Sequence, residues 1–232
     1  WKTDGTAVGT VLVADLWRGE GSGSPTGFTV SGTRIFFRAS DGIQGTMLWV
    51  TDGSAAGTKM VLQSSGGFYG QTLVNLDLGS QVLSGTDDLV AISNSSLVVS
   101  VLLAGAPPYM AARMGSTTLY SSYGVPNRAN LYRTDGTPGG SQIVTTIPNA
   151  VSTLALLTSV GSNVFFVART YPGHGSELWI SDATAGGTRE VKDIQVGAAS
   201  SIWGQLTAVG STLFFAANDG TNGVELWKSD GT

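Results

Sequence analysis

A short phrase recurs through this chain and constrains its fold more than any other feature of the sequence. The chain begins with Trp1-Lys2-Thr3-Asp4-Gly5-Thr6 and ends with Trp227-Lys228-Ser229-Asp230-Gly231-Thr232. Three further copies are Leu48–Ser54, Leu131–Thr137 and Leu178–Thr184. An internal repeat with a period of tens of residues indicates that one structural unit is built several times.

The aromatic residue of the phrase measures the period. Trp1 and Trp49 are 48 residues apart, Tyr132 and Trp179 are 47 apart, and Trp179 and Trp227 are 48 apart. The gap of 83 residues between Trp49 and Tyr132 fits two shortened periods, divided by a degenerate copy at Leu89–Ser95 with Val90 in the aromatic position. We therefore predict a single repeat domain over 1–232, with repeats 1–48, 49–89, 90–131, 132–178 and 179–226 and a surplus repeat start at 227–232.

The last period has the clearest strand pattern. It predicts strands at Glu190–Ile194, Gln205–Val209, Thr212–Ala217 and Val224–Lys228, with Gly210-Ser211 as a hairpin turn. Four short strands per period are typical of a β-propeller blade. We predict an all-β fold, a β-propeller of about five four-stranded blades. The alternative is a segment of a longer propeller or β-repeat array. A closed ring of five blades needs five copies of the phrase, and the sixth copy favours this alternative.

Doubled phenylalanines support blades that stack on both faces. Phe36-Phe37, Phe165-Phe166 and Phe214-Phe215 each follow a turn signal. Because adjacent residues of a strand point to opposite faces, each pair needs apolar cover on both sides of its sheet. A two-layer sandwich covers only one face, whereas neighbouring blades cover both.

The composition excludes several partners. Charged residues make up only 12% of the chain, the net charge is −4, and no Lys/Arg cluster occurs, so no nucleic-acid surface is expected. The chain has no cysteine, which excludes disulfides and thiolate metal sites. The most apolar stretch, Leu97 to Ala106, is too short to cross a bilayer, so we predict no transmembrane segment.

The phrase resembles a known repeat family. Glu225-Leu226-Trp227-Lys228-Ser229-Asp230-Gly231-Thr232 is similar to the ELWxxDGT repeat of large bacterial secreted or surface proteins. The likeness extends to Val191–Ile194 and Val209–Phe215, and it weakens at Asp182-Ala183, at Tyr132 and around Val90. The resemblance implies an extracellular or bacterial cell-envelope location, and it implies no reaction.

Residues that keep the phase of the repeat are interpreted as structural. We expect the aromatic series to pack on the last strand of each blade and the aspartates to turn one blade into the next. One aspartate per period is too few oxygens for calcium, so no metal site and no cofactor are predicted. The residues are Trp1, Trp49, Tyr132, Trp179, Trp227, Asp4, Asp52, Asp135, Asp182 and Asp230.

No catalytic residue is predicted. His174 is the sole histidine, and its Pro-Gly-His-Gly setting indicates an exposed loop with no assignable nucleophile. A glycosidase needs two facing carboxylic acids, and most acids here keep the phase of the repeat. We therefore predict that the protein is not an enzyme.

Aromatic residues outside the repeat phase are the candidate ligand-binding residues, because loops on a rigid scaffold carry most binding residues. We predict a non-catalytic extracellular or cell-surface module for binding, adhesion or structural assembly, whose partner is another protein or a surface glycan. The alternatives are a multivalent carbohydrate-binding lectin and a glycan-active hydrolase. The candidates are Trp17, Tyr69, Tyr109, Tyr171 and Trp203.

Overall fold

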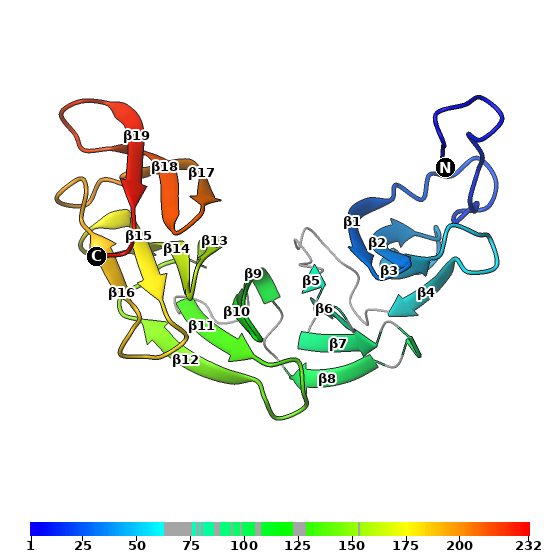
Figure 1. Ribbon diagram of the computed structural model, residues 1–232, viewed down its shortest axis with the longest axis horizontal. Coiled ribbons are helices and arrows are strands. Elements are labelled where there is room, and N and C mark those ends of the chain that lie inside the picture. The colour runs from blue at the N-terminus through cyan, green and yellow to red at the C-terminus, as the bar shows by residue number, and fades with distance from the viewer. Residues whose placement is uncertain are drawn as a thin grey trace. The chain divides into compact units, whose positions relative to one another are not determined.

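A computed structural model of the chain is built of β-strands (Figure 1). The structure describes residues 1–62, 76–77, 79, 81–85, 89–93, 95–97, 99–104, 108–122, 129–152 and 154–232. Over these ranges it contains 19 strands and no helix, so no helix there could cross a membrane. The predicted all-β class is confirmed.

The strands form five sheets, and in each sheet they follow one another in chain order. The chain divides into two compact units, residues 1–101 and residues 102–232. The first two sheets belong to the first unit, although the last strand of the second sheet crosses the boundary, and the other three sheets lie in the second unit. The first sheet contains β1 (Thr26–Ser31), β2 (Arg34–Ser40), β3 (Thr46–Thr51) and β4 (Lys59–Leu62). The second contains β5 (Leu76–Asp77), β6 (Gln81–Gly85), β7 (Leu89–Ser93) and β8 (Val99–Leu103).

The second unit holds the three remaining sheets, which have four, four and three strands. The third contains β9 (Pro108–Met114), β10 (Thr117–Ser122), β11 (Ala129–Thr134) and β12 (Gln142–Ile147). The fourth contains β13 (Ala155–Val160), β14 (Asn163–Thr170), β15 (Gly175–Ser181) and β16 (Arg189–Lys192). The fifth contains β17 (Ile202–Val209), β18 (Thr212–Asn218) and β19 (Val224–Ser229). The predicted number of blades in a propeller stays a prediction.

The predicted grouping of strands was wrong by one strand. Glu190–Ile194 was expected to open the last blade, but β16 pairs with β15 in the preceding sheet. Its register places Trp179 opposite Glu190 and Ile180 opposite Arg189. The turns at Asp52, Asp135 and Asp182 therefore each close a hairpin inside one sheet and do not lead from one sheet to the next. Pairing between β15 and β16 is local, because only seven residues, 182–188, separate the two strands.

The same hydrogen-bonded turn occurs at the five copies of the phrase that contain an aspartate. In the turn after β15, the Asp182 Oδ1 atom accepts bonds from the Thr184 backbone N–H, at 2.9 Å, and from the Thr184 hydroxyl, at 2.6 Å. The Ser181 and Thr188 hydroxyls are 2.8 Å apart across the turn. Equivalent bonds are accepted by Asp4, Asp52, Asp135 and Asp230.

A glycine five residues after the aspartate completes the turn. A Cβ atom on Gly187 would lie 2.0 Å from Asp182 Oδ1, so the carboxylate occupies the space of a side chain at this position. The same close approach occurs at Gly9, Gly57 and Gly140. The turn thus requires an aspartate and a glycine at this spacing, which explains why both recur.

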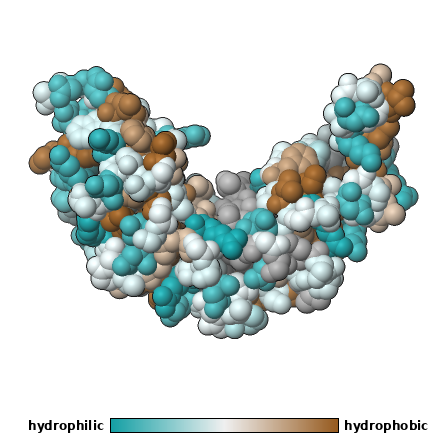
Figure 2. All heavy atoms as spheres, viewed as in Figure 1, coloured by the Kyte–Doolittle hydropathy of each residue, from teal (hydrophilic) through white to brown (hydrophobic). Residues whose placement is uncertain are grey.

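Of the doubled phenylalanines, Phe165-Phe166 divides between two apolar clusters, as its position on a strand predicts, whereas Phe214 is only half-buried beside Phe215. Phe166 is buried with Leu119, Leu131 and Leu154, toward the third sheet. Phe165 is buried with Leu206, Leu213 and Phe215, toward the fifth sheet. The fourth sheet is therefore covered on both faces within the second unit. Apolar residues nevertheless reach the surface in both units (Figure 2).

Two adjacent glycines allow a matched test of the turn. Gly187→Ala should lower the free energy of unfolding by about 1–3 kcal/mol, because the new methyl group displaces the carboxylate that accepts two hydrogen bonds. Gly186→Ala has open space around its Cβ position and should not destabilise the fold. Urea unfolding followed by circular dichroism measures both. Equal stability of the two variants would contradict this account of the turn.

Candidate functional site

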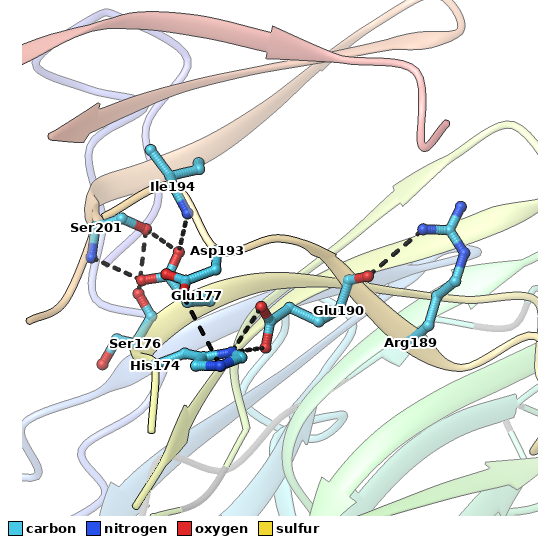
Figure 3. Close-up of polar contacts among 8 residues, drawn as sticks. All are labelled: His174, Ser176, Glu177, Arg189, Glu190, Asp193, Ile194 and Ser201. Atoms are coloured by element: carbon cyan, nitrogen blue, oxygen red, sulfur yellow. Dashed lines mark hydrogen bonds and ion pairs between the residues drawn. The ribbon is translucent and has the colours of Figure 1, made fainter. Parts of the chain in front are cut away.

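Titratable side chains gather where the β14–β15 turn meets the connection between β16 and β17 (Figure 3). The turn, residues 171–174, carries His174, and β15 carries Glu177. Glu190 lies on β16, and Asp193 starts the connection, which ends at Ser201. We name His174, Glu177, Glu190 and Asp193 the acid cluster.

Glu177 is the buried member of the cluster. Its side chain is fully enclosed, and its carboxylate accepts hydrogen bonds from the backbone N–H groups of Ile194, at 3.1 Å, and Ser201, at 3.2 Å. The Ser201 hydroxyl donates a third, short bond. One carboxylate therefore holds both ends of the connection against β15.

The backbone at the start of β15 approaches the connection closely. Gly175 has a φ of +70°, and a Cβ atom there would lie 2.3 Å from the carbonyl oxygen of Ala199. The Ser201 N–H also donates to the Ser176 carbonyl, at 3.1 Å. Only glycine fits this position, because it accepts the positive φ and leaves room for the connection.

The environment changes the acidity of Glu177. Burial disfavours the charged form and raises the pKa of the Glu177 carboxyl to about 7. The bonds from Ser201 and Ile194 oppose this change, and the nearby charge of Asp193 adds to it. Glu177 therefore exchanges its proton near neutral pH.

His174 lies between two carboxylates. Its Nδ1 atom is 3.0 Å from both oxygens of Glu190, and its Nε2 atom is 3.8 Å from Asp193 Oδ2. The hydrogen bond to Glu190, together with the charges of Glu190 and Asp193, raises the pKa of the imidazole. The His174 side chain is 49% exposed, whereas the Asp193 Oδ1 atom is buried without a hydrogen-bond partner. Among the described residues, no three such side chains are placed to hold a metal ion.

The candidate aromatic residues do not form one site. Trp17, in the first unit, lies against Gly21 and Gly42, where added Cβ atoms would be 2.2 and 2.3 Å from its ring. Tyr109 lies half-buried on β9 in the second unit. Tyr69 lies outside the described residues. Tyr171 and Trp203 come nearest to the acid cluster, since Tyr171 shares the turn of His174 and Trp203 follows Ser201 by two residues.

The aromatic residues of the repeat phrase were expected on the last strand of each blade, but Trp49, Tyr132 and Trp179 lie on the third strand of a four-stranded sheet. Their environments differ. The Trp49 Nε1–H donates to the Ala39 carbonyl, Tyr132 stacks on Tyr120 and Trp179 stacks on Phe166. Trp227 lies under the Lys192 ammonium group, which is 5.7 Å from the ring centroid. Trp1 is exposed.

Sequence reasoning missed the acid cluster. It placed His174 in an exposed loop but did not connect it with Glu190 and Asp193. Those two acids were assigned to the first strand of the next blade. There was therefore no reason to expect them beside the turn that carries His174. The local sequence carries no signal for Glu177, because Glu225 precedes Leu226 and Trp227 in the same way and is exposed, whereas Glu177 is buried.

No family model and no curated protein matches the chain. Solved structures of low sequence identity share its fold. A puromycin hydrolase is 18% identical with a TM-score of 0.52, over 83% of this chain and 33% of that enzyme. The propeller domain of the Trilobed protease from Pyrococcus furiosus is 15% identical with a TM-score of 0.54, over 90% and 69% of the two chains.

An oligogalacturonate lyase is 16% identical with a TM-score of 0.56, over 93% of this chain and 64% of that one. At such identities the likeness establishes the fold alone, which is that of β-propeller proteins. The chain spans about a third of the length of the puromycin hydrolase. The likeness to the ELWxxDGT family, the extracellular location and the partners stay predictions.

These comparisons contradict the predicted function. A non-catalytic module for binding, adhesion or assembly was expected, with a lectin and a glycan-active hydrolase as alternatives. The similar structures include a puromycin hydrolase and the propeller domain of a protease. The repeat residues indicate only the fold, and this fold also occurs within peptidases. The regularity of the repeat therefore does not exclude an enzyme.

The buried carboxyl makes stability depend on pH. Glu177 binds its proton more tightly in the folded chain, so the free energy of unfolding should fall as pH rises from about 4.5 to about 7. The loss should be at most about 3 kcal/mol and absent in Glu177→Gln. Urea unfolding at several pH values measures the difference between the two proteins. A constant difference across this range would contradict the burial of an ionisable Glu177.

Proposed function

We propose that this chain is the propeller part of an enzyme that hydrolyses peptide-like substrates, and that the acid cluster binds a positively charged segment of the substrate. The main observation behind this proposal is the position of two partly exposed carboxylates, Glu190 and Asp193, on either side of the His174 imidazole. When His174 is neutral, these charges lack a cation within the cluster. A lysine or arginine side chain of a ligand would supply one.

Exposed apolar side chains on the same segments favour a peptide over a small ion. Tyr171 is 67% exposed, Val196 is 88% exposed and Trp203 is 55% exposed. They belong to the turn of His174, to the connection that follows Asp193, and to the first residues of β17. Aromatic faces beside carboxylates suit a ligand that has both cationic and apolar groups.

The fold supports the enzymatic half of the proposal. The propeller domain of the Trilobed protease belongs to a protease by its name, and a puromycin hydrolase shares the fold. In this chain, both nitrogens of His174 face carboxylates. Binding of substrate, and not bond cleavage, is the role that this arrangement serves.

A labelled peptide tests the surface directly. A fluorescein-labelled peptide of alternating lysine and glycine should bind at pH 8, and the same peptide with glutamate for lysine should not. Glu190→Gln should weaken binding by about fivefold or more, and added salt should weaken it further, since the contact is electrostatic. Fluorescence anisotropy measures the affinity.

Glu20→Gln is the matched control, because Glu20 is exposed in the other compact unit. It should leave the affinity unchanged. Equal binding of the lysine and glutamate peptides, or an unchanged affinity in Glu190→Gln, would refute the proposed surface.

A further inference from the structure

The connection between β16 and β17 is held in place by side chains of the preceding hairpin. Glu177 accepts the bonds of Ile194 and Ser201, and His174 faces Asp193 (Figure 3). Ser176 adds a backbone bond to Ser201. The next sheet depends on this attachment, because the Asn218 N–H of β18 donates to the Ser201 carbonyl, at 2.9 Å.

Two of the groups that hold the connection, His174 and Glu177, exchange protons with water. Loss of either proton makes the cluster more negative by one charge. With His174 and Glu177 protonated, the cluster carries the charges of Glu190, Asp193 and the imidazolium, one net negative charge. With both deprotonated, it carries three carboxylates and no cation. Asp193 has no other polar contact for its buried Oδ1 atom that could compensate.

We propose that His174 and Glu177 form a proton-operated latch, which holds the connection Asp193–Ser201 against the β14–β15 hairpin below neutral pH and releases it above. Deprotonation removes the cation that bridges Glu190 and Asp193 and places a new charge beside Asp193. The connection then moves outward, because this brings Glu177 and Asp193 into contact with water. Glu190 and Asp193 stay accessible to a cationic ligand in this open arrangement.

Thermodynamic linkage fixes the direction. The hydrogen bonds that Glu177 accepts favour its charged form, but burial outweighs them and raises the pKa of its carboxyl. The pKa of His174 is also raised in the closed arrangement. Both groups bind protons more tightly when the latch is closed, so each proton lost above neutral pH favours the open arrangement.

Other charged groups nearby do not replace the imidazolium. Arg169 pairs with Ser176, whose side chain points to the opposite face of the strand from Glu177. On β16, Arg189 donates to the Gly231 carbonyl, and Lys192 lies over Trp227. Asp219, in the β18–β19 loop that contacts Gln195, accepts bonds within its own loop.

Hydrogen exchange tests the latch without any ligand. After correction for intrinsic rates, protection of a peptide spanning 193–201 should fall about tenfold or more between pH 6 and pH 8.5. A peptide spanning β14 should change less than twofold. Equal changes in the two peptides would overturn the proposal.

Glu177→Gln keeps a neutral side chain at all pH values, so the fall in protection of 193–201 should shrink to less than a third of its native size. Glu225→Gln is the matched control, since Glu225 occupies the same place in the phrase but is exposed on β19. It should retain the native pH dependence. A full-sized fall in Glu177→Gln would overturn the latch.

A second measurement remains valid if Glu177→Gln does not fold. His174 is the sole histidine, so its Cε1–H resonance in the native protein can be assigned without ambiguity. It should titrate above its usual pH, and the amide resonances of Ile194 and Ser201 should shift between pH 6 and pH 8.5. Constant amide resonances across this range would overturn the proposal.

Discussion

The packing of an aspartate carboxylate onto a glycine five residues later is the interaction on which the rest of this structure depends. In the turn after β15, the carboxylate of Asp182 lies where Gly187 would carry a side chain, and it accepts two bonds from Thr184. This turn reverses the chain so that β16 pairs with β15. It therefore determines which strands share a sheet, and it brings Glu190 and Asp193 to the edge of the hairpin that carries His174.

The acid cluster follows from a second constraint, the attachment of one sheet to the next. The connection from Asp193 to Ser201 has few strand-like bonds of its own, and the buried carboxylate of Glu177 supplies acceptors for its amides. Placing an acid in the interior raises its pKa toward neutrality, so the residue that joins the two sheets is also a group that titrates there. The structural role and the pH sensitivity have one cause, which is burial.

Regular repeats and specialised chemistry coexist in this chain. Glu225 and Glu177 occupy the same place in the phrase, yet Glu225 is exposed on β19, whereas Glu177 is enclosed between the hairpin and the connection. The identity of a repeat residue thus does not fix its environment. The same limit explains the wrong inference about function, since a fold shared with hydrolases is compatible with a highly regular repeat.

The sequence by itself determined the all-β class, the turns and the need for cover on both faces of a strand, because these depend on neighbouring residues. Phe165 and Phe166 show this, since adjacency on a strand sends them into different clusters. Only the tertiary structure decided that β16 belongs to the sheet of β15 and that Glu177 lies within reach of Ser201, 24 residues later. Burial and hydrogen bonding between segments so far apart leave no periodic trace in the chain, so the pKa of Glu177 and the partners of His174 could not be predicted from it.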